Sequence, residues 1–127
     1  MKVESFAHAC TLRGYDQATV LPDVSNYPTQ HQKALLSFAM LVIISEAINE
    51  GKEFDWDDDD QYKRYPLFDM EVSKNNPSGF RFYDAVYGLA GTTSTGGSRL
   101  CYHSSADAEH AATHFIEMYK AIMVIEK

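Results

Sequence analysis

The stretch YPLFDMEVSKNNPSGFRFYDAVYGL, residues 65–89, contains two runs of aromatic and β-branched residues around a turn-forming sequence. Residues 65–72 and 79–89 have the composition of β-strands, and NPSG between them (residues 76–79) has proline and glycine where a type I turn favours them. In the second run the apolar positions change phase near Asp84, which indicates a β-bulge. The stretch therefore predicts an antiparallel hairpin.

A third strand is predicted downstream of the hairpin. SRLCYHS, residues 98–104, is again rich in strand-forming side chains. A glycine-rich segment precedes it and would be the loop between the second and third strands. The three runs together predict a small antiparallel meander.

Upstream of the hairpin, the sequence has two helical patterns. Residues 3–10 have apolar side chains at helical spacing, and Gly14 follows as a stop. A longer apolar run predicts a helix over residues 30–50, with a capping box in TQHQ (residues 29–32) and Gly51 at the C-terminal cap.

The final predicted element is a long helix that begins with a cap formed by Ser104 and Asp107. Its apolar side chains lie on one face: Ala108, Ala111, Ala112, Phe115, Tyr119 and Ile122. We therefore expect residues 1–127 to form a single α+β domain, a three-stranded antiparallel sheet packed against helices in the order α-α-β-β-β-α.

The composition limits the classes of partner. Eleven basic against eighteen acidic residues give a net charge of −7, which opposes a groove that follows nucleic-acid phosphates. The apolar run of residues 35–48 is short for a membrane span, and the first ten residues have no signal-peptide core. We expect a cytoplasmic protein with no membrane contact, in which Cys10 and Cys101 are free thiols.

The segment GTTSTGGSR, residues 91–99, has the residue types of an anion-binding loop. A nucleotide-hydrolase phosphate loop requires lysine where Gly97 stands, followed by a helix instead of the predicted strand. An ordinary glycine-rich loop is the simpler interpretation. The alternative is a backbone site for a small anionic ligand or nucleotide signal, formed by Gly96, Gly97, Ser98 and Arg99.

Two clusters have some but not all features of metal sites. DWDDDD (residues 55–60) has carboxylates, but Asp60 and Pro66 stand where a calcium loop needs glycine and glutamate. His110 and His114 have the spacing of a zinc-ligand pair but should face solvent on the last helix. We therefore expect a solvated acidic loop, and no metal or cofactor.

A nucleophilic site is the remaining catalytic alternative. Cys101 and His103 lie two residues apart on the predicted third strand and would point to the same side, with Asp107 close in sequence. A Cys/His hydrolase is thus a possible function. The sequence shows no oxyanion hole, so we assign no catalytic residues.

One face of the second predicted helix mixes large apolar side chains with charged ones. Leu35, Phe38 and Val42 are its candidate contact residues. The partner would be either the short first helix of the same chain or the same helix of a second copy, which would make the protein a homo-oligomer.

Two stretches, residues 21–71 and 96–123, resemble a family of small proteins of unassigned function from tailed phages of Bacteroidales, crAss-like phages among them, and from related mobile elements. The matching motifs are EAINEG (residues 46–51), Trp56, YPLF (residues 65–68) and GSRLCY (residues 97–102). The resemblance implies a phage protein that is present in the host cell or in the virion.

From these observations we expect a non-catalytic phage accessory protein. It would act by binding another protein, either a virion component or a host factor, and its acidic surface suits a basic partner. The alternatives are the anion binder at residues 91–99 and the Cys/His hydrolase.

Overall fold

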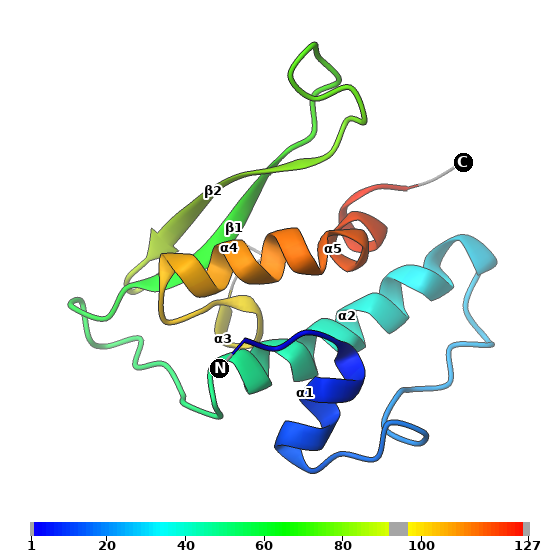
Figure 1. The fold of residues 1–127 in the computed structure, drawn as a ribbon, viewed down its shortest axis with the longest axis horizontal. Coiled ribbons are helices and arrows are strands. Elements are labelled where there is room, and N and C mark those ends of the chain that lie inside the picture. Colours follow the sequence, from blue (N-terminus) through cyan, green and yellow to red (C-terminus); the bar gives the residue numbers. More distant parts are fainter. Residues whose placement is uncertain (1, 92–96, 126–127) are drawn as a thin grey trace. The chain divides into compact units, whose positions relative to one another are not determined.

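The computed structural model describes residues 2–91 and 97–125. The chain divides into two compact units, which we describe separately. One contains Met1–Gly51 and Glu117–Lys127, and the other contains Lys52–Ile116. Whether they form one folding domain stays a prediction. The described elements are helices and a two-stranded antiparallel sheet in the order α-α-β-β-α-α, with a further four-residue helix, α3, before the last two (Figure 1).

The first unit contains α1 (Phe6–Arg13), α2 (Thr29–Ile48) and, from Glu117 on, α5 (Ile116–Met123), and α1 packs against α2. The Ser5 side chain caps α1 by accepting a hydrogen bond from His8 N, and Gly14 ends the helix with φ +76°. The predicted short first helix is therefore confirmed.

The second helix differs from prediction at its start. Thr29 is already helical and Pro28 is the N-cap residue, without a side-chain cap bond. Gln32 instead donates from Nε2 to the carbonyl of Tyr27, at 2.8 Å. The predicted capping box is thus wrong, because proline at the cap leaves no hydroxyl there to accept. At the other end the cap residue is Asn49 and not the predicted Gly51, because α2 ends at Ile48. Glu50 (φ +55°) and Gly51 (φ +72°) follow in the left-handed region, and Gly51 N donates to the carbonyl of Glu46.

Helix α2 is longer than the apolar run of residues 35–48, whose shortness was the reason for expecting no membrane span. Its twenty residues are long and apolar enough to cross a membrane, although a buried core helix meets the same criterion. Seven of its residues, Ser37 and Ser45 among them, are buried. The absence of membrane contact stays a prediction.

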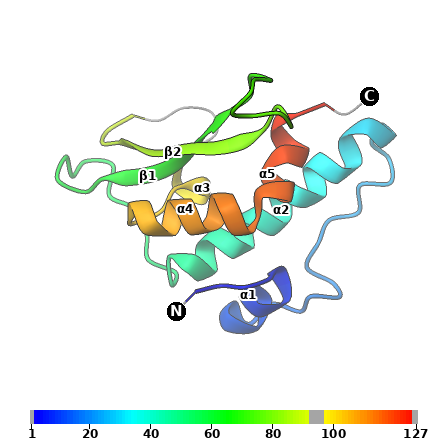
Figure 2. The same ribbon diagram turned by 45° about the horizontal axis from the view of Figure 1, so that its top comes forward.

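The second unit is a β-hairpin covered by a helix. Strands β1 (Lys63–Asp69) and β2 (Arg81–Gly88) are antiparallel, and α4 (Ser105–His114) packs against both (Figures 1 and 2). Leu67 pairs with Asp84 but Phe68 pairs with Phe82, so Tyr83 is an extra residue on β2. This confirms the bulge predicted near Asp84.

The predicted third strand is wrong. Residues 97–100 form the short helix α3 (Gly97–Leu100), and only Tyr102 pairs with a strand, as an isolated bridge to Arg64 of β1 instead of β2. Extending this bridge as a ladder would place Leu100 opposite Pro66, whose nitrogen has no hydrogen to donate. The pairing therefore stops after one residue pair.

The last helix is capped as predicted, since Ser104 Oγ accepts from Asp107 N at 3.1 Å. It is nevertheless interrupted at Phe115 (φ −112°), which separates α4 from α5 (Ile116–Met123). Nothing in the local sequence explains this break. The predicted apolar face is buried from Ala108 to Tyr119, whereas Ile122 is half-buried.

Candidate functional site

The residues predicted to bind an anion lie only partly within the described chain. Gly96 lies outside the described residues. Gly97 has φ +76° and begins α3, and Ser98 Oγ accepts a 2.7 Å hydrogen bond from Trp56 Nε1. Arg99 is exposed, and the described residues give it no ion pair or hydrogen bond. A helix of only four residues adds little dipole, so an anion here would depend on Arg99 and the Ser98 hydroxyl.

Lys63, which sequence analysis overlooked, is completely buried beside Trp56. Its ammonium donates to the carbonyl of Asp58 at 2.9 Å and lies 5.4 Å from the centre of the Trp56 ring. A buried ammonium is costly unless it is paired, and here a carbonyl and a π-face supply the compensation. The acidic connector, residues 55–60, thus folds around a buried lysine, and the only sign of this in the sequence is that Lys63 follows the aspartate run.

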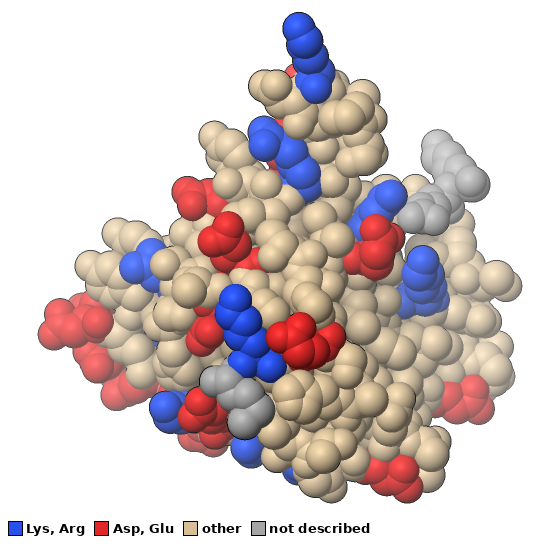
Figure 3. Space-filling view, in the orientation of Figure 1, with Lys and Arg blue, Asp and Glu red and all other residues tan. Residues whose placement is uncertain are grey.

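The acidic connector uses its carboxylates to bind its own backbone. Asp55 Oδ1 accepts from Asp57 N, and Asp58 Oδ1 accepts from Asp60 N, two consecutive turns of the kind that aspartate favours. Within the described residues, no group of three or more His, Cys, Asp or Glu side chains is placed to hold a metal ion. In the face that Figure 3 shows, acidic side chains gather over this connector.

The histidine pair on α4 is stacked. The ring centres of His110 and His114 are 5.1 Å apart with an interplanar angle of 18°, and both rings meet the edge or face of Phe115. His114 is exposed as predicted, whereas His110 is half-buried. Stacking brings ring faces together and does not aim two nitrogens at one point, as a shared metal would require.

The Cys101 and His103 side chains have separate environments. Cys101 is completely buried, and burial raises the pKa of its thiol to about 12. The ring of His103 stacks on Phe54 at 4.1 Å, with Nε2 3.2 Å from the carbonyl of Lys52. A nucleophile must be a thiolate, so this environment opposes the hydrolase hypothesis.

The hairpin end carries a group of exposed apolar side chains that sequence analysis did not single out. We call it the tip surface, and its exposed fractions are 43% for Leu67, 50% for Met70, 72% for Val72 and 61% for Tyr83. The segment that joins the strands projects beyond the part of the sheet that α4 covers (Figure 1). In Figure 3 this end carries basic side chains, one of them at its apex, among the uncharged ones.

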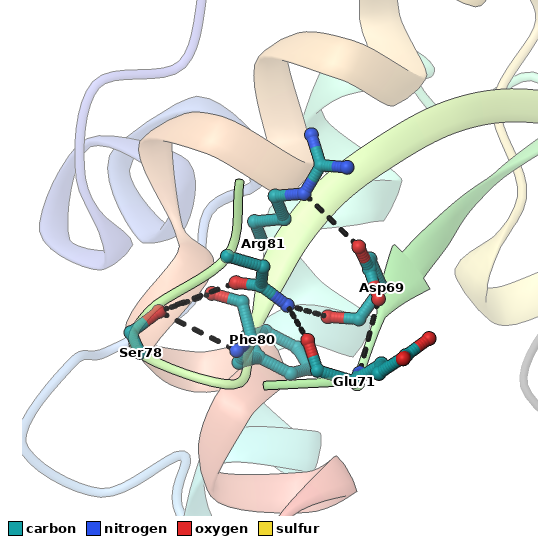
Figure 4. Close-up of polar contacts among 6 residues, drawn as sticks. Asp69, Glu71, Ser78, Phe80 and Arg81 are labelled. Atoms are coloured by element: carbon teal, nitrogen blue, oxygen red, sulfur yellow. Dashed lines mark hydrogen bonds and ion pairs between the residues drawn. The ribbon is translucent and has the colours of Figure 1, made fainter. Parts of the chain in front are cut away.

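A polar network holds the hairpin end in shape. Buried Asn76 donates from Nδ2 to the carbonyls of Asp69 and Glu71, at 2.8 and 2.9 Å. Asp69 accepts from Glu71 N and from Arg81 Nε, and Ser78 Oγ donates to the carbonyl of Phe80 (Figure 4). The hydrogen bond from Glu71 N is the largest effect that holds the pKa of Asp69 below its usual value, and Arg81 lowers it further. Partial burial acts in the opposite direction and raises this pKa. The tip surface therefore rests on an ordered support.

The turn within this end agrees with the sequence in part. Gly79 N donates to Asn76 O at 3.1 Å, which closes the turn predicted at residues 76–79. A second tight turn precedes it, where Ser73 and Asn76 exchange both backbone hydrogen bonds. Gly79 has φ +77°, and Val72 lies so close that a Cβ at this glycine would be 2.9 Å from Val72 Cγ2.

A second exposed cluster, the tyrosine platform, lies at the other end of the strands and consists of Tyr62, Arg64 and Tyr87. The two tyrosine rings stack with centres 4.5 Å apart, and the guanidinium of Arg64 lies 5.2 and 5.1 Å from them. The described residues give Arg64 no carboxylate partner. Its charge is instead placed over aromatic faces.

The predicted contact residues of α2 belong to the first unit. Phe38 is 43% exposed, and Leu35 and Val42 are half-buried. The first helix is fastened to α2 further along, where Arg13 Nε lies 3.6 Å from Glu46 Oε1 and Tyr15 donates to Glu46. Oligomer formation through Phe38 stays a prediction.

Comparison of the chain with protein-family models, curated proteins and solved structures found no match.

Proposed function

We propose that this chain is a non-catalytic accessory protein of a Bacteroidales tailed phage or a related mobile element, and that it acts by binding another protein through the tip surface. The observation that carries the binding part of the proposal is the exposure of Leu67, Met70, Val72 and Tyr83 at one end of the hairpin, whereas the phage origin rests on the resemblance of residues 21–71 and 96–123. Large apolar side chains grouped in this way are typical of interaction sites, and methionine and tyrosine are enriched at interfaces.

The polar network beneath the tip surface supports the same function. Asn76 and Asp69 tie the segment to the strand ends with hydrogen bonds of 2.8–3.1 Å. A surface that is already ordered loses less conformational entropy when it binds. The hairpin end is thus suited to present these side chains to a partner.

A comparative capture experiment tests the proposal. Immobilised wild-type chain, the tip variant Met70→Ser/Val72→Ser and the control Leu12→Ser/Tyr27→Ser are each exposed to lysate of Bacteroidales cells that carry the phage or element. The control removes two exposed apolar side chains outside the hairpin, which are 39% and 56% exposed. We expect wild type and control to retain the same protein, and the tip variant to lose it, with all three folded by circular dichroism.

Retention of that protein by the tip variant at the wild-type level would move the binding site away from the hairpin end. If none of the three chains retained a protein that the blank resin does not also retain, protein binding in this host would be refuted.

A second candidate function is the binding of a small anionic ligand by Ser98 and Arg99. It is favoured by the exposure of Arg99 and by the hydroxyl proton of Ser98, which has no acceptor among the described residues. Thermal shift against nucleotides and cyclic nucleotides tests it, because a ligand at 100 times its Kd adds about 2.7 kcal/mol. Arg99→Ala should abolish the shift while leaving the unliganded stability within about 0.5 kcal/mol of wild type.

A further inference from the structure

The outer edge of β2 can be identified from the hydrogen bonds of Arg64. Arg64 donates to Tyr102 O at 2.9 Å and accepts from Tyr102 N at 2.6 Å, so both of its backbone groups point away from β2. Pairs in an antiparallel ladder alternate between hydrogen-bonded and non-bonded ones. Tyr87, opposite Arg64, and Ala85, opposite Pro66, therefore direct their backbone groups to the edge of β2 that faces away from β1.

One donor on this edge is already used inside the strand. The carboxylate of Asp84 accepts from Ala85 N at 2.8 Å, which covers that N–H. Among the described residues, no strand other than β1 pairs with β2. The N–H and C=O of Tyr87 and the C=O of Ala85 thus remain for a partner, beside a tyrosine side chain that is half-exposed.

We propose that β2 pairs with β2 of a second copy of this chain, antiparallel and across a two-fold axis, to form a four-stranded sheet in the order β1-β2-β2-β1. Only an extended backbone matches a row of edge N–H and C=O groups. A two-fold antiparallel ladder places one residue opposite itself in the other copy. This surface is separate from the tip surface and does not depend on the proposed function.

The Asp84 contact selects the register. Pairing centred on Ala85 or Val86 would require the N–H of Ala85, which Asp84 covers. Pairing centred on Tyr87 uses the donor and acceptor of that residue in both copies, and does not need the N–H of Ala85, because Leu89, the residue opposite Ala85, lies in a bend beyond the end of β2.

Self-pairing in this register is also compatible with the side chains. Tyr87 lies opposite Tyr87, a favourable cross-strand aromatic pair, and Val86 lies opposite Gly88, the last residue of β2. Residues 86–88 carry no charge, so no like charges are opposed. A second copy is therefore complementary to this edge without any further partner.

A disulfide experiment tests the pairing and its register together. In a hydrogen-bonded antiparallel pair the two Cα atoms are about 5.5 Å apart, within the range that a disulfide spans. Tyr87→Cys should therefore form a covalent dimer under mild oxidation, seen by electrophoresis without reductant. The matched control is Tyr83→Cys, an exposed tyrosine on the same strand whose two copies would be roughly 27 Å apart in this register.

We expect the dimer from Tyr87→Cys only, because the native Cys10 and Cys101 are buried. Equal yields from the two variants would contradict the register, and a failure of Tyr87→Cys to cross-link would overturn the pairing.

A second measurement separates the contribution of the backbone N–H of Tyr87 to the pairing from that of its side chain. Tyr87→Pro and Tyr87→Ala both lose the phenol, but only the proline variant loses the edge N–H. By light scattering at several hundred micromolar we expect wild type and Tyr87→Ala to exceed the monomer mass of 14.3 kDa, and Tyr87→Pro to associate at least tenfold more weakly than Tyr87→Ala. A wild type that stays at the monomer mass, or two variants that weaken equally, would overturn the proposal.

Discussion

Asn76 lies buried within the hairpin end, where its amide donates to two backbone carbonyls from the opposite side of the segment. A side-chain amide supplies two donors from one nitrogen, which neither aspartate nor leucine can do. The local sequence identified residues 76–79 as a turn because proline and glycine mark turns by themselves. It did not identify Asn76 as a structural centre, because its partners Asp69 and Glu71 become neighbours only when the hairpin forms.

Replacing Asn76 should therefore loosen the hairpin end. Asn76→Ala leaves the carbonyls of Asp69 and Glu71 without their donor, and we expect a loss of about 1–3 kcal/mol in the free energy of unfolding. Hydrogen exchange at residues 70–80 should accelerate more than in α4. Asn75→Ala is the matched control, since Asn75 is exposed, and a similar loss in both variants would contradict the role of Asn76.

Cys101 gives a prediction for alkaline pH. Because burial raises the pKa of its thiol from 9.0 to about 12, the folded chain keeps the proton at a pH where the unfolded chain releases it. Stability should therefore fall as pH rises above the ordinary thiol pKa, with a slope from this group that approaches about 1.4 kcal/mol per pH unit. Chemical denaturation of Cys101→Ala between about pH 8 and pH 10 should show a shallower decline than wild type. If the stability of wild type and of Cys101→Ala fell with the same slope, the Cys101 thiol would ionise as readily in the folded chain as in the unfolded chain, which would contradict the prediction.

Residue-scale reasoning from the sequence placed the candidate site only in part. Ser98 and Arg99 were named because their residue types suit an anion, but the bond from Trp56 to Ser98 joins residues 42 positions apart and no local pattern predicts it. Lys63 was overlooked for the same reason. Its burial follows from the way the acidic connector folds over it, which is a tertiary feature.

At the scale of elements, the features with local signals were predicted correctly. The first helix, the hairpin, its bulge and the Ser104 cap each follow from a few neighbouring residues. The third strand failed because a strand needs a partner, and the nearest edge presents Pro66 where a donor is required. The TQHQ capping box failed because Thr29 lies one position inside the helix it was expected to cap.

The hairpin turn gives a prediction at this scale. Gly79 has φ +77° and an added Cβ would clash with Val72, whereas Gly91 has open space and no positive φ. We expect Gly79→Ala to destabilise by about 1–2 kcal/mol and to displace Val72 from the tip surface. Gly91→Ala should stay within about 0.5 kcal/mol of wild type in chemical denaturation. Equal stabilities for the two variants would show that the turn adapts to a side chain without strain.

At the scale of the whole molecule, acidic residues are concentrated in the connector, whereas the hairpin end carries charges of both signs between its exposed apolar side chains, with the Arg81 guanidinium 5.8 Å from the Tyr83 ring. The chain carries a net charge of −7, and five of its eighteen acidic residues lie in the connector at residues 55–60. The side chains of the tip surface are apolar, and the tyrosine platform places the guanidinium of Arg64 over the rings of Tyr62 and Tyr87. A protein partner would be attracted by the overall charge if it is basic, and would be held by the apolar contact.

Photo-cross-linking from the tip surface tests the central claim most directly. A benzophenone amino acid is introduced at Val72, or at Leu12 as the exposed control on α1, and the chain is irradiated in Bacteroidales cells that carry the phage or element. We expect a product at position 72 that joins the chain to one different polypeptide, and none at position 12. Equal products at both positions, or no product at position 72, would contradict it.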